Sequence, residues 1–134
     1  MGDVRSGQVL ADRRPTLAGT WRNELGSELT LIEESGCVLG GWYRSGVGQT
    51  LAPRPLTGSC VRRADGSAVL GFVVGWPATD SLATWTARYQ PVGDQIVATW
   101  LLESGSADRT TWRATRLGSD VFQRSAGSGG ERAS

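Results

Sequence analysis

The side chains that could do chemistry in this sequence are short polar groups near the ends of apolar segments. They are Asn23, Ser27, Tyr43, Ser45, Ser81 and Asp120. The surrounding segments are rich in tryptophan, with six Trp against two Tyr and two Phe. Tryptophan walls with a few converging hydrogen-bonding groups suit a compact, mostly apolar ligand. The pattern therefore predicts non-covalent binding rather than catalysis.

The composition excludes several kinds of active site. The sequence contains no His, which excludes a Ser-His-Asp triad, a His metal ligand and a His general base. Its two Cys are too few for a four-thiolate zinc site. An enzyme on this scaffold would need a second carboxylate beside Asp120, and Glu24 and Glu103 are expected on the surface. We therefore expect no catalytic residue, no metal and no cofactor.

The net charge and the distribution of apolar residues limit the kinds of partner and the cellular location that we expect. A net charge of +1 argues against nucleic acid or a membrane surface as the main partner. No apolar run reaches the ~20 residues that a membrane helix needs. The first residues lack the apolar region of a signal peptide. We expect a secreted or periplasmic protein whose signal peptide is absent from this chain.

Turn residues divide the chain into short segments in which apolar and polar residues alternate, the pattern of strands. Strands are predicted at residues 20–24, 28–33, 38–44, 54–60, 69–76, 83–90, 95–103 and 110–122. No segment keeps an apolar helical period, so no substantial helix is expected. Eight consecutive hairpin-linked strands favour an all-β, antiparallel up-and-down barrel, because closure removes the edge strands. A β-sandwich is the structural alternative.

The two ends of the chain have a different composition from its middle. Residues 1–16 are polar and charged, and residues 125–134 are rich in Gly and Ser. We interpret these segments as a flexible lead-in and a disordered tail. The barrel is expected to span residues 17–124.

Several blocks, taken together and in order, resemble the avidin/streptavidin family of biotin-binding proteins. They are GTWRNELGS at 19–27, LGGWYRSGVG at 39–48, LTG at 56–58, GFVVGW at 71–76, TW at 84–85, TWLL at 99–102 and WRATRLGSDVF at 112–122. The resemblance covers roughly residues 17–124. It implies an avidin-like barrel that binds and sequesters biotin, or biotinylated molecules, with high affinity and without enzymatic activity.

The resemblance implies roles for individual side chains. Asn23, Ser27 and Tyr43 match the donors to the ureido oxygen of biotin. Ser45 and Asp120 match the acceptors for its two ureido N–H groups. Further positions match the Trp cage, the apolar lining and the contacts to the valerate carboxylate. These are Trp76, Trp85, Trp100, Leu25, Val47, Leu102, Ser81 and the backbone near Gln49.

Two further implications concern assembly and affinity. Trp112 matches a Trp that a neighbouring subunit lends as a lid, which favours a homotetramer, with a dimer as the alternative. Ala83 stands where the family usually has a Thr that contacts the ligand sulfur. Losing that weak contact should cost on the order of 1 kcal/mol.

The two Cys are predicted to form a disulfide. Cys37 opens one predicted strand and Cys60 ends the next, so a hairpin through residues 46–53 would bring them face to face. Two buried free thiols or one reactive Cys remain the alternatives. Several of the binding residues also have a plainer interpretation: the Trp residues as core, Asn23 and Ser27 as turn residues, Ser81 as an ordinary loop residue, and Asp120 as a cap or an ion-pair partner of Arg113 or Arg116. A lipocalin-like carrier of another small apolar ligand is the alternative function.

Overall fold

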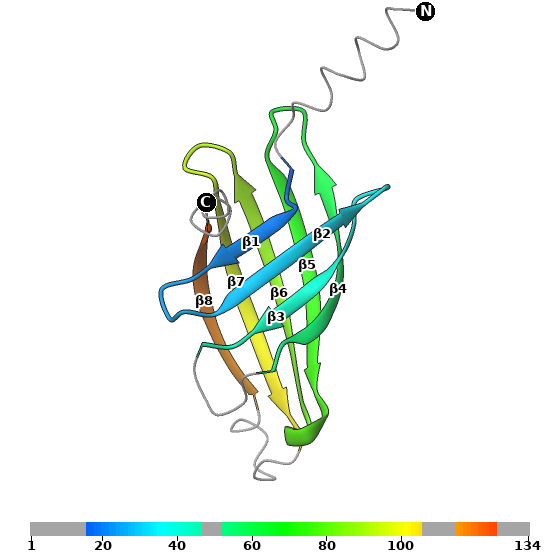
Figure 1. Ribbon diagram of the computed structural model, residues 1–134, viewed down its shortest axis with the longest axis vertical. Coiled ribbons are helices and arrows are strands. Elements are labelled where there is room, and N and C mark those ends of the chain that lie inside the picture. The colour runs from blue at the N-terminus through cyan, green and yellow to red at the C-terminus, as the bar shows by residue number, and fades with distance from the viewer. Residues whose placement is uncertain (1–15, 47–51, 106–114, 126–134) are drawn as a thin grey trace, which may run out of the picture.

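The strands of the chain close into one eight-stranded barrel (Figure 1). The computed structural model describes residues 16–46, 52–105 and 115–125. The strands are β1 Gly19–Arg22, β2 Glu28–Glu34, β3 Val38–Arg44, β4 Arg54–Arg62, β5 Ala68–Trp76, β6 Ser81–Gln90, β7 Gln95–Ser104 and β8 Thr115–Arg124. Each strand pairs antiparallel with the next, and β8 pairs with β1. The expected up-and-down barrel is therefore confirmed.

Some boundaries differ from the expected ones for local reasons. β1 ends at Arg22, because Asn23 accepts two backbone hydrogen bonds in the turn that follows. β6 begins at Ser81, because a short 3-10 helix, η1 at Pro77–Thr79, completes the preceding turn. No helix among the described residues is long and apolar enough to cross a membrane. Residues 1–15 and 126–134 lie outside the described residues, so the expected lead-in and tail stay predictions.

Alternation along the strands fills the interior. On β6, Ala83, Trp85, Ala87 and Tyr89 are buried while the residues between them are exposed. Because consecutive strands run in opposite directions, the β1–β2, β3–β4, β5–β6 and β7–β8 connections all lie at one end, called here the loop end. The opposite end, called the closed end, carries the β2–β3, β4–β5 and β6–β7 turns.

Packed aromatic side chains fill the interior of the barrel at its closed end. Trp21 is fully buried edge-on to Tyr89, and its indole N–H donates to the Leu17 carbonyl at 3.1 Å. The Arg124 guanidinium lies 4.3 Å above the Trp21 ring and pairs with Asp94 at 2.7 Å. Hydrogen bonds from Arg124 lower the pKa of Asp94 despite its partial burial. Burial of a large aromatic side chain contributes about 2–3 kcal/mol, so this end stabilises the fold.

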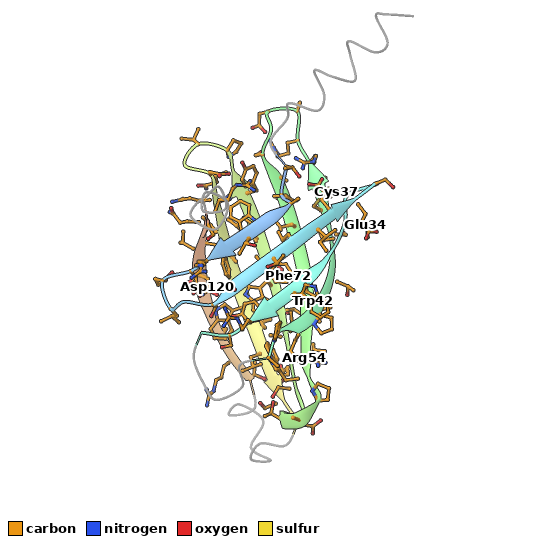
Figure 2. The ribbon with its side chains drawn as sticks, in the orientation of Figure 1. Glu34, Cys37, Trp42, Arg54, Phe72 and Asp120 are labelled. Atoms are coloured by element: carbon orange, nitrogen blue, oxygen red, sulfur yellow. A yellow bond between two sulfur atoms is a disulfide. The ribbon has the colours of Figure 1, made fainter. Side chains whose placement is uncertain are left out.

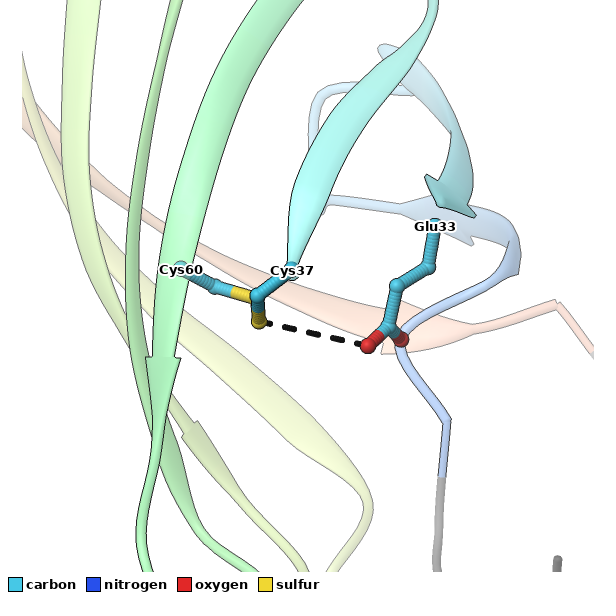
Figure 3. Close-up of side chains that lie close together, drawn as sticks. All are labelled: Glu33, Cys37 and Cys60. Carbon is cyan, nitrogen blue, oxygen red and sulfur yellow. Dashed lines mark hydrogen bonds between the residues drawn. A yellow bond between two sulfur atoms is a disulfide. The ribbon is translucent and has the colours of Figure 1, made fainter. Parts of the chain in front are cut away.

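A disulfide and an ion pair join neighbouring strands at the same end. Cys37 and Cys60 are bonded with their Cα atoms 5.2 Å apart, which confirms the predicted disulfide. Glu33 lies beside the bridge, with Oε2 4.0 Å from Cys37 Sγ (Figure 3). The three side chains are close enough to suggest a metal site, but the disulfide removes both thiolates from that role. Glu33 instead pairs with Arg62 at 2.7 Å and accepts the Leu17 backbone N–H at 3.0 Å.

Candidate functional site

A cavity with a volume of about 240 Å³ opens at the loop end of the barrel; it is called here the main cavity because most of the expected binding residues line it. That size suits one compact ligand. Its lining comes from β3 and from β5 to β8, and from the segments that follow β1 and β3. The lining residues are Asn23, Leu25, Ser27, Tyr43, Ser45, Trp76, Ala83, Trp85, Trp100, Leu102, Arg116 and Asp120.

The β1–β2 turn fixes the orientation of the Asn23 amide. Asn23 Oδ1 accepts the backbone N–H of Leu25 at 3.0 Å and that of Ser27 at 2.9 Å. An amide oxygen has two lone pairs, and both are used here. The Nδ2 group is therefore the donor of this buried side chain; one of its hydrogens lies toward Asp120, and the other can serve a ligand in the cavity.

A close approach between two loops places Ser27 and Ser45. The Gly46 N–H donates to Ser27 Oγ at 2.9 Å. A Cβ at Gly46 would lie 2.3 Å from the Leu25 carbonyl oxygen, so only glycine allows this approach. The hydrogen bond holds the end of β3 against the β1–β2 turn, which brings both hydroxyl groups to the same side of the cavity.

Tyr43 presents a protonated hydroxyl in an aromatic setting. Its ring lies 6.0 Å from Trp76 and 4.8 Å from Trp85, centroid to centroid. Burial raises the pKa of Tyr43 and outweighs the lowering by the hydrogen bond with Ser27, and the charge of Asp120 adds a smaller rise. The hydroxyl is therefore a donor across the physiological pH range.

Asp120 is a buried carboxyl with no cationic partner in the part of the chain that the structure describes. It is 7% exposed, and no ion pair joins it to another described residue, Arg116 included. Burial raises the pKa of Asp120, and this outweighs the lowering by the nearby N–H groups of Trp85, Asn23 and Trp100. Figure 2 shows Asp120 on β8, well away from Cys37 at the closed end. The cavity thus contains an acceptor that the fold leaves poorly compensated.

Trp85 adds an unsatisfied donor beside this acceptor. Its ring is 4% exposed and stacks on Phe72 at 4.9 Å. Its Nε1 is buried without a hydrogen-bond partner of good geometry, although it lies near enough to Asp120 to lower that pKa. Buried polar groups are nearly always satisfied, so an unsatisfied one in a cavity is typical of a ligand site.

Trp100 completes the aromatic lining because β8 has a glycine opposite it. Trp100 pairs with Gly118, and a Cβ at that glycine would lie 2.4 Å from the indole ring. The missing side chain lets the ring lie against the β8 backbone. Trp76, Trp85 and Trp100 therefore surround one volume.

The structure brings together most of the site residues expected from the sequence. Asn23, Leu25, Ser27, Tyr43, Ser45, Trp76, Trp85, Trp100, Leu102 and Asp120 all line the main cavity. Ser81 does not; it lines a neighbouring cavity on the far side of Trp76. Val47, Gln49 and Trp112 lie outside the described residues.

The sequence comparison assigns the family. A sequence model of the avidin family matches residues 11–125. The chain belongs to the avidin family. Chicken (Gallus gallus) avidin is 30% identical over 125 residues, which cover 86% of this chain and 82% of avidin. Chicken avidin-related protein 4/5 is 32% identical over 123 residues, covering 86% of this chain and 81% of that protein.

A solved structure agrees with the family assignment. The crystal structure of a biotin-binding protein from chicken superposes with a TM-score of 0.73 at 31% identity. The match covers 84% of this chain and 98% of that one. The avidin-like barrel expected from the sequence is thus confirmed by topology and by overall shape.

Sequence reasoning assigned no ligand role to two arginines of this avidin-family site. Arg116 lines the main cavity, on the same face of β8 as Gly118 and Asp120. Counting alternate residues back from Asp120 would have found it. Arg54 lines the neighbouring cavity, and only the packing of β4 against β5 reveals it. Arg22, next to Asn23, is exposed instead and pairs with Glu28.

Proposed function

We propose that this protein is a non-enzymatic binder of biotin, which it holds tightly enough to sequester it. One observation carries the proposal. In an avidin-family chain, an unsatisfied indole N–H, the amide N–H2 group of Asn23 and a buried carboxyl that forms no ion pair with a described residue converge in one tryptophan-lined cavity. These groups demand a ligand that offers both acceptors and donors on a compact apolar body, and the bicyclic urea of biotin is such a ligand.

The ureido oxygen would be held by three donors. Asn23 Nδ2 and the hydroxyls of Ser27 and Tyr43 come from three different segments and line the same cavity. Donors fixed in advance around an oxygen with partial negative charge stabilise it without reorganisation. The turn hydrogen bonds to Asn23 and the Gly46 contact to Ser27 supply that rigidity.

The ureido N–H groups would be held by Ser45 and Asp120. A hydrogen bond from the ligand favours the ionised form of Asp120, which burial disfavours in the empty protein. A carboxylate on one N–H shifts charge toward the ureido oxygen, so donors and acceptor reinforce each other.

The rest of the ligand would contact the aromatic lining. Trp76, Trp85 and Trp100 would surround the bicyclic ring and thioether, with Leu25 and Leu102 completing the apolar surface. Val47 and the backbone near Gln49 are proposed contacts that lie outside the described residues, and so is Trp112, the proposed lid from a neighbouring subunit.

We further propose a homotetramer, with a dimer as the alternative. Outward-facing Leu82, Leu101 and Leu117 are 45–71% exposed on the three consecutive strands β6, β7 and β8. Such an apolar outer face favours association. The disulfide is in keeping with a secreted or periplasmic protein. Light scattering of wild type and Trp112→Lys, with and without biotin, tests the assembly.

Calorimetric titration with biotin, together with thermal unfolding, tests the binding. Biotin should bind at one site per chain and raise the melting temperature strongly. Tyr43→Phe removes one donor and keeps the ring, so its affinity should fall about tenfold. Asn23→Asp keeps the turn acceptor and removes the donor, so it should lose at least as much. Arg22→Gln, adjacent to Asn23 but outward-facing, is the matched control. No heat and no thermal shift at saturating biotin would reject the proposal.

A further inference from the structure

A second cavity adjoins the main one at the loop end and shares Trp76 as a wall. This rim cavity is more open and has a volume of about 450 Å³. Its lining residues are Arg54, Gly75, Trp76, Pro77, Asp80, Ser81, Leu82, Glu103 and Gly105. Because Trp76 lines both spaces, a ligand seated in the main cavity can extend past its ring into the rim cavity.

Arg54 is the cationic side chain among the described residues that line the rim cavity. Leu56 pairs with Val74, so Arg54, two residues earlier on β4, lies level with Trp76 on β5. The Arg54 Nε donates to the Gly75 carbonyl at 2.9 Å. No described residue forms an ion pair with it. Figure 2 shows Arg54 nearer the η1 end of the barrel than Cys37.

The hydrogen bond to Gly75 orients the Arg54 guanidinium group so that it can bind an anion. The Nε hydrogen bond fixes the plane of the guanidinium and leaves its two terminal nitrogens available. A guanidinium held in this way pairs well with a carboxylate, at little further cost in side-chain entropy. Ser81 lines the same cavity, with its hydroxyl 3.0 Å from the Thr79 carbonyl and 3.3 Å from Ser104 Oγ.

We propose that Arg54 anchors the carboxylate at the free end of the bound ligand, so that the protein favours free biotin over amide- or ester-linked biotin. The inference rests on the proposed function and adds a specificity to it. An amide or ester has no charge to pair with the guanidinium, whereas the free acid is ionised at neutral pH. Ser81, expected from the sequence to contact this carboxylate, would act beside Arg54.

Two carboxylates beside Arg54 should weaken its attraction for the carboxylate of the ligand. Asp80 and Glu103 also line the rim cavity, but both are exposed, where water and salt screen their charges. Both oxygens of Glu103 already accept from the Thr115 hydroxyl at 2.8 Å. The preference for the free acid should therefore be modest, and Asp80→Asn should strengthen it.

Arg116 is the rival anchor, because it lines the main cavity itself. Its side chain is exposed, and no hydrogen bond from a described residue fixes it. Ordering a free arginine costs more side-chain entropy than using one already held. Arg54 is therefore the better-prepared cation, and Arg116→Gln tests this directly.

The experiment compares biotin with biotinamide on four proteins: wild type, Arg54→Gln, Arg116→Gln and Arg88→Gln. Arg88 is an exposed residue of β6 that lines neither cavity, so its variant controls for net charge. Dissociation rates are measured by a fluorescence chase at low salt and again at high salt. Arg54→Gln should release biotin about fivefold faster and biotinamide less than about twofold faster. High salt should shrink the difference in wild type and leave Arg54→Gln unchanged.

The outcomes separate the two proposals. If wild type binds neither compound, the proposed function fails. If wild type binds both, the anchor is wrong when Arg54→Gln alters both release rates equally or alters neither. It is also wrong when Arg116→Gln rather than Arg54→Gln abolishes the preference for the free acid. A selective effect of Arg54→Gln with Arg88→Gln unchanged supports the proposal.

Discussion

The pKa of a carboxyl group removed from water shifts in opposite directions at the two ends of the barrel. At the closed end, burial alone would raise the pKa of Glu33, but hydrogen bonds from Arg62 and Leu17 outweigh it and the pKa is lowered. At the loop end, burial raises the pKa of Asp120, and no arginine among the described residues forms an ion pair with it. The compensated carboxylate holds the fold together, whereas the uncompensated one remains available to a ligand.

The tryptophans repeat this contrast. Trp21 at the closed end donates its indole N–H to Leu17, and Arg124 covers its ring. The Trp85 Nε1 in the main cavity has no partner of good geometry. Residues of one type thus stabilise the fold where their polar atoms are satisfied. They indicate a binding site where those atoms are left open.

The largest effect is expected from removing the disulfide at the closed end, which should lower stability without changing the binding site. Replacing Cys37 and Cys60 with Ser should lower the free energy of unfolding by about 3 kcal/mol, because the disulfide restricts the unfolded chain. Biotin affinity should stay within about twofold, since the bridge lies at the end opposite the main cavity. Denaturant unfolding and calorimetry measure the two quantities. A large loss of affinity without a loss of stability would contradict the separation of the two ends.

The next largest effect is expected from a change in the binding site that should lower biotin affinity without lowering the stability of the fold. Asp120→Asn should weaken biotin binding by about 2 kcal/mol, the contribution of a hydrogen bond to a charged group. The empty variant should be at least as stable as wild type at neutral pH, because it no longer buries an ionised carboxyl.

The pH dependence checks the same point. A carboxyl whose pKa is raised on folding gives the empty protein extra stability as the pH falls through its folded pKa. That gain should be absent from Asp120→Asn in unfolding curves measured from neutral to acid pH. Loss of stability in the variant at neutral pH would mean that Asp120 supports the fold.

Glu33→Gln should change the pH dependence of stability in the opposite direction to Asp120→Asn, because the pKa of Glu33 is lowered rather than raised. Glu33 has a lowered pKa, so its contribution is present above the unfolded pKa and is lost as the pH falls through the folded value. The variant should be less stable by roughly 1.5 kcal/mol at neutral pH. The difference from wild type should vanish in acid, with biotin affinity unchanged at neutral pH. A difference that persists unchanged at low pH would exclude the ionised carboxylate as its source.

The smallest effect concerns Ala83 in the main cavity. Ala83→Thr adds a hydroxyl where the family usually has one, and release of biotin should slow by a few-fold, on the order of 1 kcal/mol or less. Desthiobiotin, which lacks the sulfur atom, is the control and should gain nothing. Equal slowing of both ligands would mean that Thr acts by filling space rather than through the sulfur.

Local patterns determined much of this protein. Alternation and turn residues fix the strands, because side chains of a strand point to opposite faces in turn. The ordered motifs from residue 19 to residue 122 point to the family and to most of the residues around the main cavity. The disulfide pairing also followed from strand order.

Closure of the barrel decided the rest, because contacts between strands far apart in sequence depend on register and packing. Arg54 lies level with Trp76 because of the register between β4 and β5. The position of Trp100 against Gly118 follows from the β7–β8 register, and the lack of a partner for Trp85 emerges only once every neighbour is in place. The sequence by itself thus determined which residues face inward. Only the tertiary structure decided which inward polar groups satisfy one another and which remain for a ligand, since hydrogen bonding depends on distance and angle in space.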